Sequence, residues 1–108
     1  TKTEAAKVQA ATEAYNTAIK GLADSYGLAF VDANAKMKEL NSASGIQWDG
    51  VKYTAKFVTG GAFSLDGVHP LGRGYAIIAN EFLKAINTKY RSNLPMVSPN
   101  SYSGVKFP

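Results

Sequence analysis

The longest periodic pattern of apolar positions lies at the start of the chain. Between residues 3 and 26, apolar side chains recur at steps of three and four, so they share one face of a helix. The positions on this face are Val8, Ala11, Tyr15, Ala18 or Ile19, Leu22 and Tyr26. Thr3 suits an N-cap, and Gly27 is well placed as the left-handed residue that ends a helix. The pattern therefore predicts a helix over residues 3–26.

The next segment has a different pattern. Residues 28–34 read LAFVDAN, and a nearly uninterrupted apolar run directly after a helix is typical of a strand covered on both faces, as in a parallel sheet. Asp32 or Asn34 is placed to cap a following helix that ends near Gly45. That helix is expected to turn three side chains inward: Ala33, Met37 and Leu40. The order of helix, buried strand and helix predicts an α/β layered structure.

The middle of the chain carries a hairpin signal. Asp49-Gly50 between Trp48 and Val51 is typical of a two-residue turn, and the segment over residues 55–61 is expected to extend the second strand until Gly60-Gly61 breaks it. The helical period then returns over residues 71–90, through Tyr75, Ile78, Ala79, Phe82, Ala85, Ile86 and Tyr90.

The end of the chain has no period. From Arg91 onward it contains three prolines, several serines and Gly104, which predicts an irregular strap or a disordered end. We therefore divide the chain into residues 1–90, which belong to one domain, and an irregular tail over residues 91–108.

The predicted strand lacks neighbours. A buried apolar strand needs partners for its amides and carbonyls, and the other strand candidates form a hairpin of mixed polarity. The chain also starts at Thr1 rather than at a methionine, as an excerpt of a longer protein would. We expect the missing strands to come from an absent N-terminal portion or from a second copy of the chain.

Composition narrows the class of protein. The 108 residues are 45% hydrophobic and 19% charged, which is ordinary for one small soluble domain. No apolar run approaches the roughly 20 residues that span a membrane, and export would need a signal segment outside this chain. Without cysteine there is no disulfide, and the compartment stays open.

The charge pattern argues against nucleic-acid binding. The formal net charge is +4, but the ten lysines and two arginines are scattered along the chain. A nucleic-acid interface more often concentrates basic residues on one face, together with aromatic side chains. No nucleic-acid partner is expected.

The only histidine, His69, stands three residues after Asp66, with Gly67 between them and Pro70 following. A carboxylate at this spacing in a turn is able to accept the Nδ1 hydrogen of the imidazole, which leaves Nε2 free as a base. The plain alternative is a surface pair near a helix N-terminus. A metal site is not expected, because two ligands are too few and no second histidine or cysteine exists. No organic cofactor is called for either.

Two segments resemble the C-terminal part of the SGNH (GDSL-type) hydrolases, a superfamily of esterases, lipases and acylhydrolases. They read FSLDGVHPLGRGYAIIANEFLKAIN and AYNTAIKGLADSYGLAFVDANAKM. The resemblance rests on the Asp-x-x-His-Pro block at Asp66–Pro70, followed by Gly74-Tyr75. It implies a three-layer α/β/α sandwich with a mostly parallel sheet, whose N-terminal strands are missing from this chain. It also implies that His69 is the general base and later the acid, and that Asp66 orients it.

The chain departs from this family in one important respect. The serine nucleophile of the family lies in a Gly-Asp-Ser-like block near the start of the enzyme, and no such block is present here. Ser64 stands too close to Asp66 to face Nε2, so we expect a structural role for it. The resemblance implies the C-terminal part of a serine ester hydrolase, inactive alone, acting on an ester of unknown class. The alternative is a non-catalytic α/β module that self-associates or packs on a partner.

Overall fold

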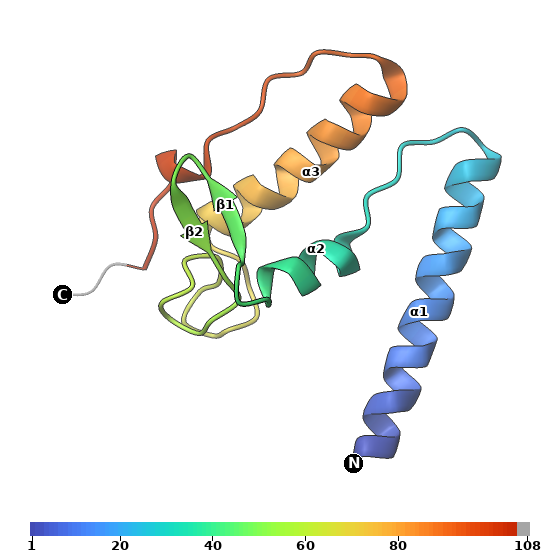
Figure 1. Ribbon diagram of the computed structural model, residues 1–108, viewed down its shortest axis with the longest axis horizontal. Helices are drawn as coiled ribbons and strands as arrows, with labels where there is room; N and C mark the ends of the chain where they lie inside the picture. The colour runs from blue at the N-terminus through green and yellow to red at the C-terminus, as the bar shows by residue number, and fades with distance from the viewer. Residues whose placement is uncertain (106–108) are drawn as a thin grey trace.

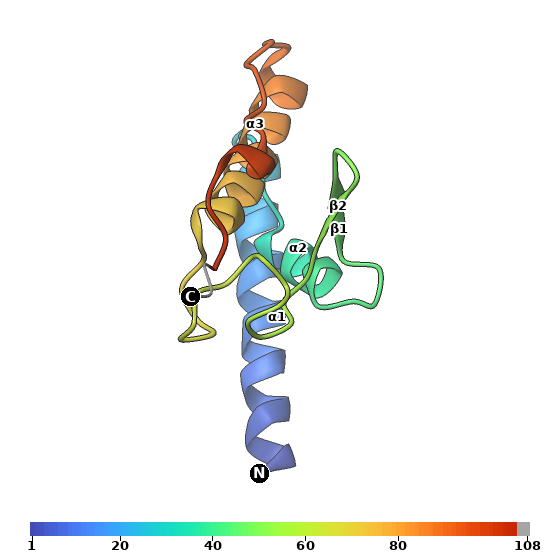
Figure 2. The same cartoon turned by 90° about the vertical axis from the view of Figure 1, so that its left-hand side faces the viewer.

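The computed structural model describes residues 1–105, and three helices dominate it (Figure 1). The elements are α1 (Lys2–Ser25), α2 (Ala33–Leu40), β1 (Ile46–Trp48), β2 (Val51–Tyr53), α3 (Gly72–Tyr90) and the 3-10 turn η1 (Pro99–Ser101). The hairpin, α2 and the first half of α3 lie together, whereas α1 stands apart from them (Figures 1 and 2). The molecule is a thin plate with extents of 50 × 46 × 21 Å.

The predicted α/β/α sandwich with a mostly parallel sheet is wrong for this structure. Over residues 1–105 the sheet consists of β1 and β2 alone, and the two strands are antiparallel. Of residues 28–34, predicted to form a buried strand, 28–32 connect α1 to α2 and 33–34 begin α2, and none of them enters a strand pairing. The physical reason is that a strand exists only through a partner's backbone, and the described residues offer this segment none.

The first helix closely follows its predicted extent. Its N-cap lies two residues earlier than expected, at Thr1 rather than Thr3: the Thr1 hydroxyl accepts from the Glu4 amide at 3.3 Å, and the Glu4 carboxylate accepts from the Thr1 amine. Gly27 takes the left-handed conformation (φ 65°), as predicted. The predicted apolar face is largely uncovered, with five side chains more than half exposed: Val8, Tyr15, Ile19, Leu22 and Tyr26.

The predicted hairpin is confirmed and is shorter than expected. Asp49 and Gly50 both have positive φ (44° and 77°), the combination that favours a tight two-residue turn between twisted strands. Register pairs Trp48 with Val51 and Ile46 with Tyr53. Beyond Tyr53 no strand continues through residues 55–61.

The core lies where the hairpin meets α2, α3 and the loop before α3. It consists of Leu40, Ile46, Tyr53, Ala62 and Ile77. Although α3 forms where predicted, its buried face differs from the predicted one. The buried side is Gly74, Ala76, Ile77 and Asn80, whereas Tyr75, Ile78, Phe82 and Tyr90 of the predicted face are exposed.

Glycine explains which face of α3 is buried. A Cβ at Gly74 would collide with the carbonyl oxygen of Ala62. The missing side chain therefore lets the first turn of α3 approach the loop backbone closely. The larger side chains of Tyr75 and Ile78, which directly follow the buried Gly74 and Ile77, remain exposed.

The chain after α3 is a strap through residue 105, one of the two predicted outcomes; residues 106–108 lie outside the described part. Asn80, nearly fully buried, donates to the Val97 carbonyl at 2.7 Å and accepts from the Val97 amide at 2.9 Å. Seven residues further along α3, Asn87 bonds both backbone groups of Leu94 in the same way. None of the helices within residues 1–105 has the length and apolar character needed to cross a bilayer.

The two asparagines provide a matched stability test. We expect Asn80→Ala to lower the free energy of unfolding by about 2–4 kcal/mol, because it leaves partly buried backbone groups of Val97 unpaired. Asn87→Ala removes the same two bonds, and a third from the Ser92 hydroxyl, at an exposed site where water replaces them, and should cost about 1 kcal/mol or less. Urea unfolding followed by circular dichroism measures both. Equal losses would contradict this account of the strap.

Candidate functional site

The site predicted from the sequence lies in the loop between the core and α3. We call residues 62–71 the Asp66–His69 loop. Two backbone bonds close its neck: the Leu71 amide donates to the Ala62 carbonyl at 2.9 Å, and the Ser64 amide donates to the His69 carbonyl at 2.8 Å. Since Ala62 belongs to the core, the neck ties the loop to the best-packed part of the molecule.

The tip of the loop is a tight turn. The Gly67 amide donates to the Ser64 carbonyl at 3.0 Å, and Gly67 has a φ of 70°, which an L side chain rarely adopts. A Cβ at this position would also lie 3.3 Å from the ring of Phe57. Glycine therefore permits the turn that directs the two side chains of the predicted pair toward each other.

The structure brings the two predicted site residues together. Oδ2 of Asp66 lies 2.6 Å from Nδ1 of His69. The other carboxylate oxygen, Oδ1, accepts three bonds: from Ser64 Oγ at 2.5 Å and from the Val68 and His69 amides at 2.9 Å each. One oxygen is thus fixed by the loop, and the other is presented to the imidazole. The catalytic role of the pair stays a prediction.

The same bonds set the ionisation of Asp66. The hydrogen bond from Ser64 contributes most, followed by the Val68 amide, the His69 side chain and the His69 amide, and together they hold the pKa of Asp66 well below its usual range. Each donor stabilises the charged carboxylate. Asp66 therefore remains an acceptor throughout the neutral range.

The imidazole is open to solvent. The side chain of His69 is 75% exposed and that of Asp66 49%. Nε2 has no bonding partner among residues 1–105, so it is free to meet a proton donor from outside. The arrangement is able to orient a base, but this part of the chain supplies no wall that would exclude water from it.

Two further charged residues, Asp32 and Arg73, have structural roles. Asp32 caps α2 by accepting from the Ala35 amide at 2.8 Å, as one sequence interpretation held. Arg73 donates from Nε to the Tyr102 carbonyl at 2.7 Å and so helps to hold the strap. Within residues 1–105, no three histidine, aspartate or glutamate side chains are grouped so that they could hold a metal ion.

Sequence reasoning missed how directly Ser64 engages the pair. Its hydroxyl faces Asp66 rather than Nε2, which agrees with the prediction that it is not the nucleophile. The missed signal is local: a serine two residues before an aspartate in a turn is well placed to bond both its backbone and its carboxylate.

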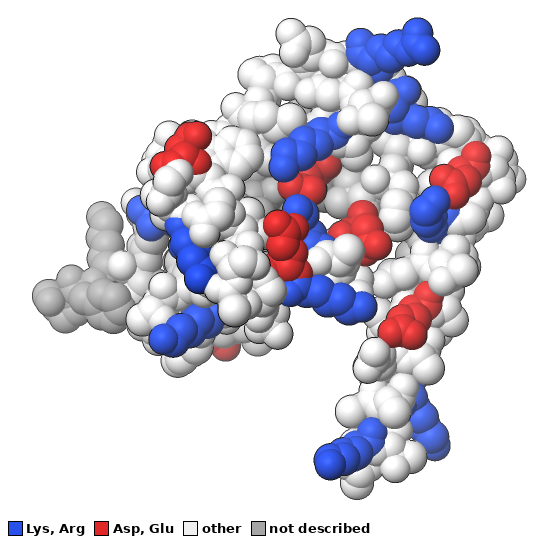
Figure 3. Space-filling view, in the orientation of Figure 1, with Lys and Arg blue, Asp and Glu red and all other residues white. Residues whose placement is uncertain are grey.

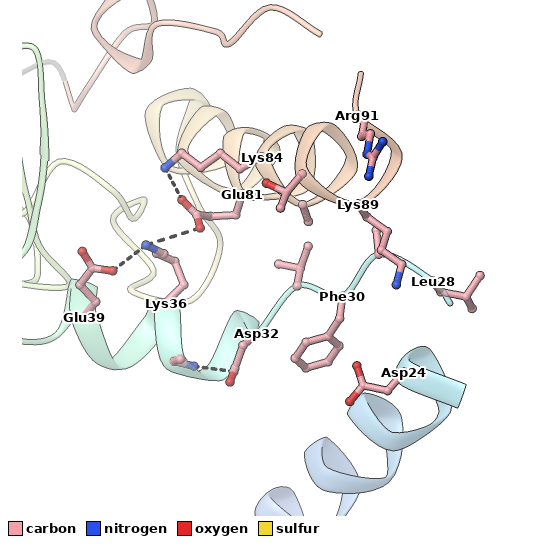
Figure 4. A pocket seen from close by; sticks show the side chains of 15 residues that line it. Asp24, Leu28, Phe30, Asp32, Lys36, Glu39, Glu81, Lys84, Lys89 and Arg91 are labelled. Atoms are coloured by element: carbon pink, nitrogen blue, oxygen red, sulfur yellow. Dashed lines mark hydrogen bonds and ion pairs between the residues drawn. The ribbon is translucent and has the colours of Figure 1, made fainter. Parts of the chain in front are cut away.

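Two cavities lie near the predicted elements. An open one of about 400 Å³ borders the loop, with Phe63 and Gly67 on one side and Asn34, Met37, Lys38, Asn41 and Ala55 on the other. A wider one of about 810 Å³ lies between the end of α1, residues 28–31, α2 and α3 (Figure 4).

The charged side chains that line the wider cavity neutralise one another. Lys36 pairs with Glu39 at 2.6 Å and with Glu81 at 3.5 Å, while Lys84 pairs with the same Glu81 at 2.9 Å. Burial lowers the pKa of Lys36, but the two acidic partners outweigh burial and raise it. Basic and acidic side chains alternate around this hollow on the face seen in Figure 3. The cavity therefore shows no excess of one charge that would select a ligand.

Comparison with family models, with curated proteins and with solved structures finds no match to this chain. Any functional assignment depends on the geometry of the Asp66–His69 loop and on the sequence resemblance.

The pKa of Asp66 predicts a pH dependence of stability. Because this pKa is lower in the folded chain than the roughly 3.9 of an unfolded aspartate, its contribution is fully present above about pH 4 and is lost as the pH falls further. The difference in unfolding free energy between the wild type and Asp66→Asn should therefore be larger at neutral pH than in acid. Urea titrations at about pH 7 and pH 2.5 measure it.

Asp24→Asn is the control, because its carboxylate pairs with the exposed Lys20 on α1 and not with backbone amides. A difference for Asp66→Asn that stays constant across the range would contradict the assignment.

Proposed function

We propose that this chain supplies the histidine–aspartate pair of a serine ester hydrolase of the SGNH type. The observation that carries the proposal is the bond of 2.6 Å between Asp66 Oδ2 and His69 Nδ1, with Oδ1 held by three further donors. That arrangement fixes the imidazole in the tautomer that leaves Nε2 as a base. The sequence resemblance around Asp66–Pro70 supports the same reaction class.

In the proposed reaction, Nε2 of His69 takes the proton of a serine hydroxyl as the serine oxygen attacks the ester carbonyl. The imidazolium then donates that proton to the leaving alcohol, and an acyl-enzyme remains. Water repeats the sequence, and the acid is released. Asp66 stays ionised and stabilises the imidazolium in both halves.

The serine and the oxyanion donors come from an N-terminal portion of the same protein outside this chain, because a second copy would lack the same Gly-Asp-Ser-like block. The ester class stays open, because side chains that would contact the acyl and alcohol groups are not defined by the pair. No metal or cofactor is part of the proposed reaction.

The uncovered apolar surface supports a polypeptide partner. Ile19, Leu22 and Phe82 line an open apolar cavity of about 370 Å³ with residues 28–31, and all three are more than half exposed. Exposed apolar side chains gathered in one place are typical of an interaction site.

The decisive test is the coding region upstream. We expect an in-frame Gly-Asp-Ser-type block there, and we expect the longer polypeptide to hydrolyse p-nitrophenyl esters and to react with a fluorophosphonate at that serine. His69→Ala should lower kcat by about 10⁴-fold or more, because the serine loses its base. The present chain alone should be no faster than equimolar imidazole.

Lys56→Ala, an exposed change in the preceding loop, serves as the control for handling and folding. Labelling of Ser64 in the present chain, or full activity of His69→Ala, would contradict the proposal.

A second candidate function is self-association without catalysis. The accessible surface is 7565 Å², about 1,800 Å² more than the roughly 5,800 Å² expected for a compact chain of 11.5 kDa. The radius of gyration, 15.7 Å, likewise exceeds the roughly 13 Å expected for 108 residues. An excess of this size matches what one protomer buries in a large obligate dimer.

The apolar face of α1 is compatible with a second copy. Its positions Val8, Ala11, Tyr15, Ile19 and Leu22 are spaced three, four, four and three residues apart, which is symmetric about Tyr15. Two antiparallel copies of α1 would therefore place equivalent apolar positions opposite one another, as a two-fold interface requires.

Leu22→Lys tests this candidate. If α1 pairs with itself, the wild type should sediment as a dimer, and Leu22→Lys should weaken association at least about tenfold by burying an unpaired charge. Ala10→Lys, on the opposite side of α1, should leave association unchanged. A wild-type chain that sediments as a folded monomer at the highest soluble concentration would exclude self-association.

A further inference from the structure

We propose that Ser64 is a positioning residue, which holds the Asp66 carboxylate in the orientation that presents Oδ2 to His69. This role rests on the proposed function, because orienting the imidazole matters for catalysis only if His69 transfers protons. Ser64 is neither nucleophile nor ligand in this proposal. It acts through Asp66.

The first observation is a reciprocal pair of contacts. Ser64 Oγ donates to Asp66 Oδ1 at 2.5 Å, and the same oxygen accepts from the Asp66 amide at 3.4 Å. The hydroxyl thus contacts both ends of one residue. Rotation of the carboxylate about its Cβ–Cγ bond would break the shorter contact, so Ser64 resists that rotation.

The second observation is where Ser64 stands in the loop. The Val68 and His69 amides approach Oδ1 from the arm of the loop that carries the histidine, whereas Ser64 approaches from the other arm. The backbone bond from the Ser64 amide to the His69 carbonyl, 2.8 Å long, fixes the two arms relative to each other. Donors on both sides of the carboxylate oxygen confine it more closely than donors on one side.

The third observation concerns the surrounding charges. Across residues 1–105, no charged side chain of α2, the hairpin or α3 bonds Asp66 or His69. Lys38 of α2 borders the cavity beside Gly67, and Arg73 at the start of α3 is engaged by the Tyr102 carbonyl. The carboxylate therefore depends on neutral donors of its own loop, among which Ser64 is the one side-chain hydroxyl.

The experiment is an NMR titration of the wild-type chain and of Ser64→Ala, Ser64→Thr and Ser64→Val. The ¹³C shift of the Asp66 carboxyl reports its ionisation, and the ¹⁵N shifts of His69 at about pH 8.5 report which ring nitrogen holds the proton in the neutral imidazole. Ser92→Ala is the control, because its hydroxyl bonds the Asn87 side chain far along the chain from the loop.

In Ser64→Ala the pKa of Asp66 should rise toward the ordinary value of about 3.9, because the largest of the bonds that stabilise the carboxylate is gone. The ratio of Nδ1-protonated to Nε2-protonated imidazole should fall about fivefold, the factor that one neutral hydrogen bond is worth. Ser64→Thr, which keeps a hydroxyl, should retain both wild-type values. Ser64→Val, which matches threonine in shape, should behave as alanine does.

The amide spectrum of each variant reports whether it is folded. If Ser64→Ala does not fold, the comparison of Thr with Val at this position decides. A folded Ser64→Ala or Ser64→Val with unchanged Asp66 ionisation and unchanged tautomer ratio would overturn the proposal. A wild-type Asp66 pKa at or above the ordinary value would overturn it without any variant.

These measurements need no turnover, so the two proposals fail separately. Loss of the tautomer preference in Ser64→Ala, together with an inactive longer polypeptide, would retain the positioning role and remove the hydrolase. An active longer polypeptide in which Ser64→Ala leaves the Asp66 pKa and the His69 tautomer ratio unchanged would retain the hydrolase and remove the positioning role. In an active polypeptide, Ser64→Ala should lower kcat about tenfold with little change in KM. The loss is smaller than full misplacement of His69 would cause, because the Val68 and His69 amides still hold the Asp66 carboxylate.

Discussion

The bond between the Ser64 amide and the His69 carbonyl is the constraint on which the candidate site depends. It closes a loop of six residues, and within so short a loop the carboxylate of Asp66 has no choice of partners but the loop's own amides, hydroxyl and imidazole. The neck is in turn anchored by Ala62 in the core. Packing at one end of α3 thus determines the geometry of a pair that is itself exposed.

Local features were predictable from the sequence because their causes are local. The helical period, the Asp49-Gly50 turn and the spacing of Asp66 and His69 each depend on residues within a few positions of one another. These predictions correspond to α1, the β1–β2 hairpin, α3 and the hydrogen-bonded pair. Local chemistry alone placed the candidate site correctly in a loop before a helix.

Features that depend on distant partners were not predictable in the same way. The apolar run at residues 28–34 reads as a strand, but strand pairing is a property of two segments, and the second is not among those described. The buried face of α3 was also mispredicted, since the absence of a side chain at Gly74, rather than the presence of Phe82 or Tyr75, decides which side approaches the core. Both errors share a physical origin. A pattern of apolar residues indicates which side chains prefer burial, but it does not identify the segment that buries them.

The strap after α3 is held to the helix through its backbone. The side chains of Asn80 and Asn87 form hydrogen bonds with the backbone amide and carbonyl groups of Val97 and Leu94. These bonds do not involve the side chains of Val97 and Leu94. Side-chain bonds of this kind from a helix to the backbone of an adjacent segment do not depend on the side chains of that segment. They exclude only proline, which lacks the amide hydrogen. The side chain of Leu94 is exposed, so over evolutionary time this position of the strap is free to change to anything but proline, while the path of the strap along the helix stays the same.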